Sequence, residues 1–135
     1  MVSVLIKSDT RYEVNRKALR DAVRTTLSEQ GVTGEQEVSV FVVGNRKMRS
    51  LNAKYRDIHE TTDVLSFPYA EGGQFIESPD QVRRLGDIVL SYPEAVRQAA
   101  IDNVLVDEEI TKLVSHGTMH LLGFDHDALG KWFFR

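Results

Sequence analysis

The chain has 135 residues, of which 41% are hydrophobic and 27% charged, and it contains no cysteine. These values are typical of one globular domain spanning residues 1–135, and they exclude disulfides and thiolate zinc sites. The net charge of −3 at pH 7 argues against nonspecific binding to duplex DNA, and no apolar run reaches the roughly 18 residues that span a bilayer. With no signal peptide in the first residues, we expect a cytoplasmic protein without membrane or DNA partners.

Hydrophobic periodicity in the first half of the chain predicts strand, helix, strand and helix in succession. Gly31 follows the first helical pattern as a stop, and Gly44 bounds a β-branched run that is typical of a buried strand. Asn45 can cap the second helix. The expected elements are a strand over 2–6, a helix over about 15–30, a strand over 38–43 and a helix from 45, with Met48, Leu51 and Tyr55 as its inward stripe.

The second half of the chain predicts two strands in succession and then two helices. Pro68 must place its strand at a sheet edge or terminate it, and Pro93 suits the first turn of a helix. Asp107, Glu108 and Glu109 favour the start of the last helix because carboxylates are stabilised at the positive end of the helix dipole. The expected elements are strands over 61–68 and 86–91, a loop over 71–84 between them, and helices over 93–101 and about 107–122. This order predicts an α+β fold, with helices packed against a mixed sheet of about four strands.

Three of the four histidines lie in one short window, with the sequence HGTMHLLGFDH. His116 and His120 are four residues apart and therefore share a helix face, and Gly123 can end that helix and reverse the chain toward His126. Such a histidine pair often arises by chance, but neutral imidazoles among apolar neighbours gain little unless they bind something. The window therefore predicts one divalent ion per chain, with Zn²⁺ preferred, at the end of the last long helix. Three ligands leave a position open for water, as in catalytic zinc sites.

Gly117 distinguishes this window from that of the zinc proteases. In the protease helix His-Glu-x-x-His, the glutamate beside the first ligand is the general base. Because glycine stands at that position here, peptidase chemistry by the same route lacks an obvious base.

Charge is divided unevenly along the chain. Residues 1–56 hold eleven Lys and Arg against six Asp and Glu, whereas residues 57–135 hold six against fourteen. Such cations commonly do no more than solvate helices. The second predicted helix nevertheless carries five cations and no acid, and it is the best candidate for a track that binds an anionic partner: Arg46, Lys47, Arg49, Lys54 and Arg56.

Other polar residues have two readings each. Asp125 could orient an imidazole or take a proton, or it could be a turn residue that bonds its own backbone. Asp63 and Ser66 could line a cleft beside the metal, although hydrogen bonding at a strand end explains them equally well. Asp87 has the same two readings, and His59 is interpreted as a surface residue.

The histidine window resembles the signature of the YbeY family of metal-dependent endoribonucleases, which are also described as rRNA maturation factors. Two further segments match that family in the same order, Leu-Asn-x-x-Tyr-Arg over 51–56 followed by Thr-Asp-Val-Leu-Ser-Phe over 62–67, and Leu-Gly-Asp-Ile over 85–88. The resemblance implies cleavage of single-stranded RNA by an ion on His116, His120 and His126, with His116 and Arg56 as catalytic residues. It also implies a role in maturing the 3′ end of small-subunit rRNA and in ribosome quality control, with the ribosome or its associated proteins as partners.

The end of the chain departs from the family pattern. After His126 the family is expected to continue with an acidic helix, whereas this chain continues toward Trp132, Phe133 and Phe134. These side chains could present an apolar patch to a partner or pack against the core, and we expect core packing. Two other functions stay open at this point. One is a metal hydrolase of another substrate, such as a peptide, and the other is a noncatalytic ribosome-binding module whose metal is structural.

Overall fold

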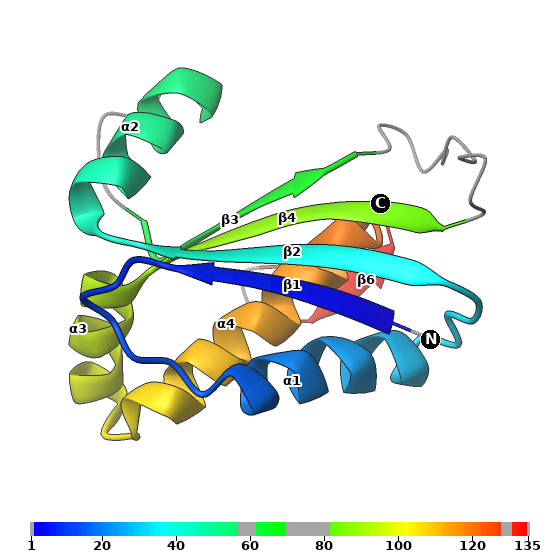
Figure 1. Ribbon diagram of the computed structural model, residues 1–135, viewed down its shortest axis with the longest axis horizontal. Helices are drawn as coiled ribbons and strands as arrows, with labels where there is room; N and C mark the ends of the chain where they lie inside the picture. The colour runs from blue at the N-terminus through cyan, green and yellow to red at the C-terminus, as the bar shows by residue number, and fades with distance from the viewer. Residues whose placement is uncertain (1, 57–61, 70–81, 128–130, 135) are drawn as a thin grey trace.

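Four helices and two sheets make up the part of the chain that the computed structural model describes, residues 2–56, 62–69, 82–127 and 131–134 (Figure 1). In chain order the elements are β1 (Val2–Ser8), α1 (Arg16–Glu29), β2 (Gln36–Val43), α2 (Asn45–Arg56), β3 (Val64–Pro68), β4 (Arg83–Ser91), α3 (Tyr92–Asp102), α4 (Val106–Leu121), β5 (Phe124–His126) and β6 (Trp132–Phe134). Each of the predicted strands and helices is present.

The larger sheet is mixed, with the strand order β1-β2-β4-β3. β1 pairs with β2 and β2 with β4 in parallel, whereas β3 pairs with β4 in antiparallel. Pro68 lies in the edge strand β3, where a missing backbone N–H need not break a hydrogen-bond ladder, as predicted. β4 begins at Arg83, before the predicted start at residue 86; most of the predicted loop over 71–84 lies outside the described residues. The α+β class and the mixed four-stranded sheet are confirmed.

The sheet separates two hydrophobic layers. Helices α1, α3 and α4 lie on one face, and α2 lies on the other, as Figure 1 shows. The larger core is on the three-helix side, where Val38 and Val40 of β2 are fully buried together with Val114 of α4. A smaller cluster of Met48, Leu65 and Val89 lies on the α2 side. Side chains of β2 alternate between the two layers, because successive residues of a strand point to opposite faces.

Local signals set the helix ends. The Asn15 side chain accepts a hydrogen bond from Ala18 N at 3.0 Å and caps α1. Ser91 caps α3 in the same way, accepting from Glu94 N at 3.3 Å. Gly123 follows α4 with a φ of +93°, a left-handed conformation that lets the chain reverse into β5.

Three side chains lie elsewhere than the sequence predicts. Tyr55 is 57% exposed, so it is not part of the inward stripe of α2; its ring packs edge-on against Phe67 at 5.2 Å instead. Phe133 and Phe134 are 48% and 67% exposed, so the expectation of core packing is wrong for both. They belong to β6, which pairs with β5 in a two-stranded sheet that the sequence did not predict.

Candidate active site

The fold brings the three histidines of the short window together. His116 and His120 occupy the last two turns of α4, and His126 ends β5 after the reversal at Gly123. The ring centroid of His126 lies 5.4 Å from that of His120 and 6.3 Å from that of His116. One helix end and one short strand therefore position all three imidazoles.

The His120 ring is oriented by the backbone. Its Nδ1 atom lies 3.0 Å from the carbonyl oxygen of Phe124. A carbonyl can only accept, so Nδ1 carries the proton and donates it. This tautomer leaves Nε2 with the lone pair that a metal ion needs, an arrangement that is common behind metal-binding histidines.

The pKa of His116 is lowered below the ordinary value of 6.5. Burial of the ring is the main cause, because a charged imidazolium is poorly solvated there, and the positive charge of Lys112 acts in the same direction. The neighbouring histidines add to the effect, and the Asp63 carboxylate opposes it. His116 is therefore neutral at pH 7, which is the form that binds metals.

Three imidazole nitrogens are ligands that suit a zinc-type ion. In this structure the three imidazole rings surround the Trp132 side chain. Two imidazoles on one tetrahedral ion have ring centroids about 5 Å apart, given metal–nitrogen distances of about 2.0–2.1 Å. The 5.4 Å between His120 and His126 is close to this value, whereas the 6.3 Å between His116 and His126 is longer. Within the described ranges, however, no three His, Asp or Glu side chains lie in a geometry that could hold a metal ion.

Trp132 lies among the three histidines. Its ring contacts His116, His120 and His126 edge to face, at centroid distances of 5.3, 5.4 and 5.1 Å. β6 supplies this contact, because Trp132 stands directly opposite His126 in the β5–β6 pair. The segment that departs from the family pattern therefore forms one wall of the histidine site.

Gly117 lets α4 lie directly on the sheet. A Cβ atom at this position would lie 2.8 Å from Cγ2 of the buried Ile88 in β4. The Gly117 carbonyl accepts a hydrogen bond from the Ser66 hydroxyl of β3 at 3.2 Å. This bond joins strand to helix, which supports the structural reading of Ser66.

Of the predicted aspartates, Asp125 accepts a hydrogen bond from His126 N through its side chain at 2.8 Å, as a turn residue does. Asp87 accepts one from the Tyr69 hydroxyl at 2.8 Å, on the α2 side of the sheet. Asp63 is close enough to His116 to influence its pKa. This charge interaction leaves the predicted cleft role of Asp63 open.

Arg56 does not join this cluster in the described structure. It is the last residue of α2, is exposed, and belongs to a helix on the opposite face of the sheet from α4 (Figure 1). His59 lies outside the described residues.

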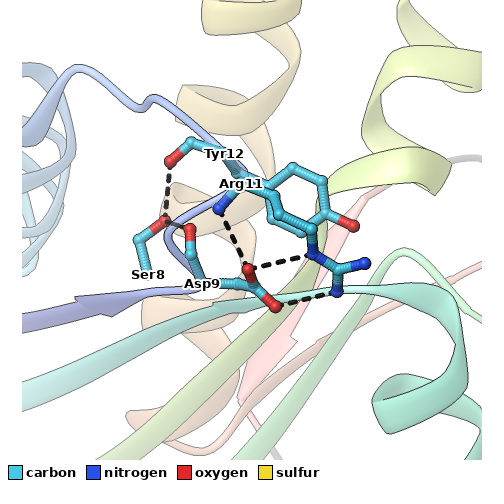
Figure 2. Close-up of polar contacts among 4 residues, drawn as sticks. All are labelled: Ser8, Asp9, Arg11 and Tyr12. Atoms are coloured by element: carbon cyan, nitrogen blue, oxygen red, sulfur yellow. Dashed lines mark hydrogen bonds and ion pairs between the residues drawn. The ribbon is translucent and has the colours of Figure 1, made fainter.

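The cations of α2 form an exposed surface of their own. All five predicted track residues are exposed: Arg46, Lys47, Arg49, Lys54 and Arg56. Two of them, Arg46 and Lys47, border a cavity of about 550 Å³ that also contacts the segment after β1. In that segment Arg11 donates two side-chain hydrogen bonds to Asp9, at 3.1 and 2.9 Å (Figure 2). These bonds are the main reason why the pKa of Asp9 is lowered to about 2. Because Asp9 neutralises Arg11, the positive charge of this region comes from α2.

A family model described as Endoribonuclease YbeY matches residues 5–131. The chain belongs to the YbeY family. It is 42% identical to the Endoribonuclease YbeY of Desulforamulus reducens over 110 residues, which cover 82% of this chain and 72% of that protein. It is 33% identical to the Endoribonuclease YbeY of Dehalococcoides mccartyi over 133 residues, covering 93% of this chain and 83% of that protein.

The fold agrees with this YbeY assignment. A solution structure of a Thermotoga maritima protein matches with a TM-score of 0.57 and 25% identity, over 94% of this chain and 75% of that one. The resemblance drawn from three short motifs is thus confirmed at the level of the family. In the parts of the chain that the structure describes, no helix is both long and apolar enough to cross a membrane.

Proposed function

We propose that this YbeY-family chain is a metal-dependent endoribonuclease that cleaves single-stranded RNA with one divalent ion, preferably Zn²⁺. The observation that carries the proposal is the convergence of His116, His120 and His126 from two elements of the chain. Its relatives support the reaction class, since those compared above are each named Endoribonuclease YbeY.

The three imidazoles would hold the ion through neutral nitrogen atoms. When bound, a divalent ion on neutral ligands supplies Lewis-acid charge to a phosphoryl oxygen and lowers the pKa of a nearby water. The Phe124 carbonyl holds His120 in the required tautomer. Burial lowers the pKa of His116, so this ligand does not have to lose a proton first at pH 7.

Arg56 is assigned to phosphate binding. A guanidinium is permanently charged and can donate two parallel hydrogen bonds to phosphate oxygens. Its exposure at the end of α2 and the other cations of that helix support contact with an RNA backbone. A pairing with Asp57 is the competing role, and the nucleophile is either water or the 2′-hydroxyl of the RNA.

The cellular role follows from the family resemblance. We propose that the substrate is rRNA near the 3′ end of the small subunit, that the ribosome or its associated proteins are partners, and that the protein acts in the cytoplasm. Zinc-protease chemistry is disfavoured because Gly117 stands where that chemistry needs a glutamate, and a Cβ atom at this position would collide with Ile88. A structural metal is disfavoured because the histidine window supplies three ligands, whereas structural zinc sites use four protein ligands.

The test uses end-labelled single-stranded RNA and a duplex of the same sequence. Zinc-loaded wild type should cleave the single strand, and both a chelator and His120→Ala should abolish cleavage. His59→Ala is the matched control, since it removes the one histidine outside the window and should keep the activity. Equal cleavage by wild type and His120→Ala, with zinc bound to the wild type, would refute the proposal.

A further inference from the structure

A second concave site lies on the face of the sheet opposite α4. It is a cavity of about 330 Å³ between α2 and the strands β2, β3 and β4. Most of its lining is apolar, and its floor belongs to the smaller hydrophobic cluster. The three histidines take no part in it, so it is separate from the proposed metal site.

Three aromatic rings line this cavity, one from each of three elements. Phe41 comes from β2, Phe67 from β3 and Tyr55 from α2. Tyr55 remains 57% exposed although it packs edge-on against Phe67. Exposed aromatic rings beside a cavity are surfaces on which a flat ligand can stack, and every nucleobase presents such a face.

Two charged side chains reach the same cavity from opposite sides. Asp87 of β4 accepts a hydrogen bond from Tyr69 at 2.8 Å, and a carboxylate can accept several more. Lys47 of α2 contributes an ammonium group with three donors. Guanine complements this pair, because its Watson–Crick edge donates N–H groups to a carboxylate while its O6 and N7 atoms accept from a lysine.

The charge around the cavity favours RNA over a basic protein partner. α2, which forms one wall, carries five exposed cations and no acidic residue. A phosphate backbone running along this helix would be attracted to it, whereas a cationic peptide would be repelled. Aromatic rings flanked by cations are the combination that binds single strands in other folds.

We propose that this cavity binds one unpaired nucleobase of single-stranded RNA, guanine in preference, while the backbone contacts α2. The inference rests on the proposed function in that the bound strand is the RNA to be cleaved. It adds a substrate-binding position on the far side of the sheet from the histidines.

The experiment measures RNA affinity in a His120→Ala background, where the strand stays intact. The probe is a fluorescein-labelled oligouridine with one central guanosine, followed by anisotropy. Tyr55→Ala should weaken binding roughly 5- to 140-fold, the range for loss of one stacked base, and leave the salt dependence unchanged. Tyr55→Phe keeps the ring and should bind like the background. Leu5→Ala removes a 52% exposed apolar side chain outside the cavity and should also bind normally.

Base preference is tested with the same probe and an all-uridine strand. The background protein should prefer the strand with guanosine, and Asp87→Asn should reduce that preference. Equal affinity of Tyr55→Ala and Leu5→Ala would overturn the proposal, as would a loss in Tyr55→Ala that Tyr55→Phe shares. Cleavage by the protein with His120 intact is assayed in parallel, so a failed nuclease and a failed base pocket give different results.

Discussion

Replacing Gly117 by alanine tests how closely α4 approaches the sheet. Alanine normally stabilises a helix interior by about 1 kcal/mol relative to glycine. Here the new methyl group would lie 2.8 Å from Cγ2 and 3.2 Å from Cγ1 and Cδ1 of Ile88. Ile88 is fully buried and β-branched, so it cannot swing away, and overpacking of this kind costs about 1–3 kcal/mol. The two effects combine to a net destabilisation of about 1 kcal/mol.

A double-mutant cycle isolates the clash. Ile88→Ala removes all three atoms that the methyl group would meet, at a cost of about 2–5 kcal/mol for the cavity. In that background Gly117→Ala should stabilise the protein by about 1 kcal/mol, so the sign of its effect reverses. Urea unfolding of the metal-free protein, followed by circular dichroism, gives the four free energies.

The helix-propensity contribution has its own control. Ala100→Gly at an exposed position of α3 should cost about 1 kcal/mol and measures that contribution without any clash. If Gly117→Ala stabilises the wild type by the amount that Ala100→Gly costs, the close approach of helix and sheet is refuted. The physical reason why this helix cannot carry a glutamate after its first histidine would then be lost as well.

Three further outcomes follow from the structure. Zn²⁺ titration should change the fluorescence of Trp132, the chain's one tryptophan, and the change should saturate at one ion per chain. His120→Ala should show no change, and zinc binding by the wild type without a fluorescence change would contradict the placement of the ion beside Trp132. Asp9 should titrate in NMR spectra with a pKa of about 2, so its stabilising contribution is present above pH 3.8 and is lost as the pH falls toward 2; Arg11→Ala should return the pKa toward 3.8. Gly86→Ala should destabilise the protein by more than about 2 kcal/mol in urea unfolding. The φ of Gly86 is +147°, and a Cβ atom there would collide with the Phe67 carbonyl oxygen of β3. An unchanged free energy of unfolding would refute this close approach.

The order of elements could be predicted because local signals agree with the tertiary structure. Asn15 and Gly123 act where their conformational preferences place them, at a helix start and after a helix end. The grouping of the three histidines was predictable for the same reason, since it depends on a helix repeat and one reversal. Both arguments need only short-range geometry.

Side chains whose surroundings come from distant parts of the chain could not be predicted. Helical spacing suggested that Tyr55 points inward, but the spacing does not reveal that it lies at an exposed rim beside Phe67. Glu109 was assigned to the first turn of α4 for its charge, yet it is 2% exposed, with Lys112 Nζ 3.6 Å away. The position of Trp132 among the imidazoles depends on the β5–β6 pairing, which is too short for a periodic signal.

The order of the elements also determines when the core and the histidine site can form during synthesis. All four strands of the larger sheet and three of the described helices precede residue 103, but α4 then supplies Ile110, Leu113 and Val114 to the main core. The same helix carries two of the three histidines, and the third follows it directly. A growing chain therefore closes its core and acquires its proposed metal ligands in nearly the same step. We expect a partly synthesised chain to be inactive toward the RNA of the ribosome that is making it.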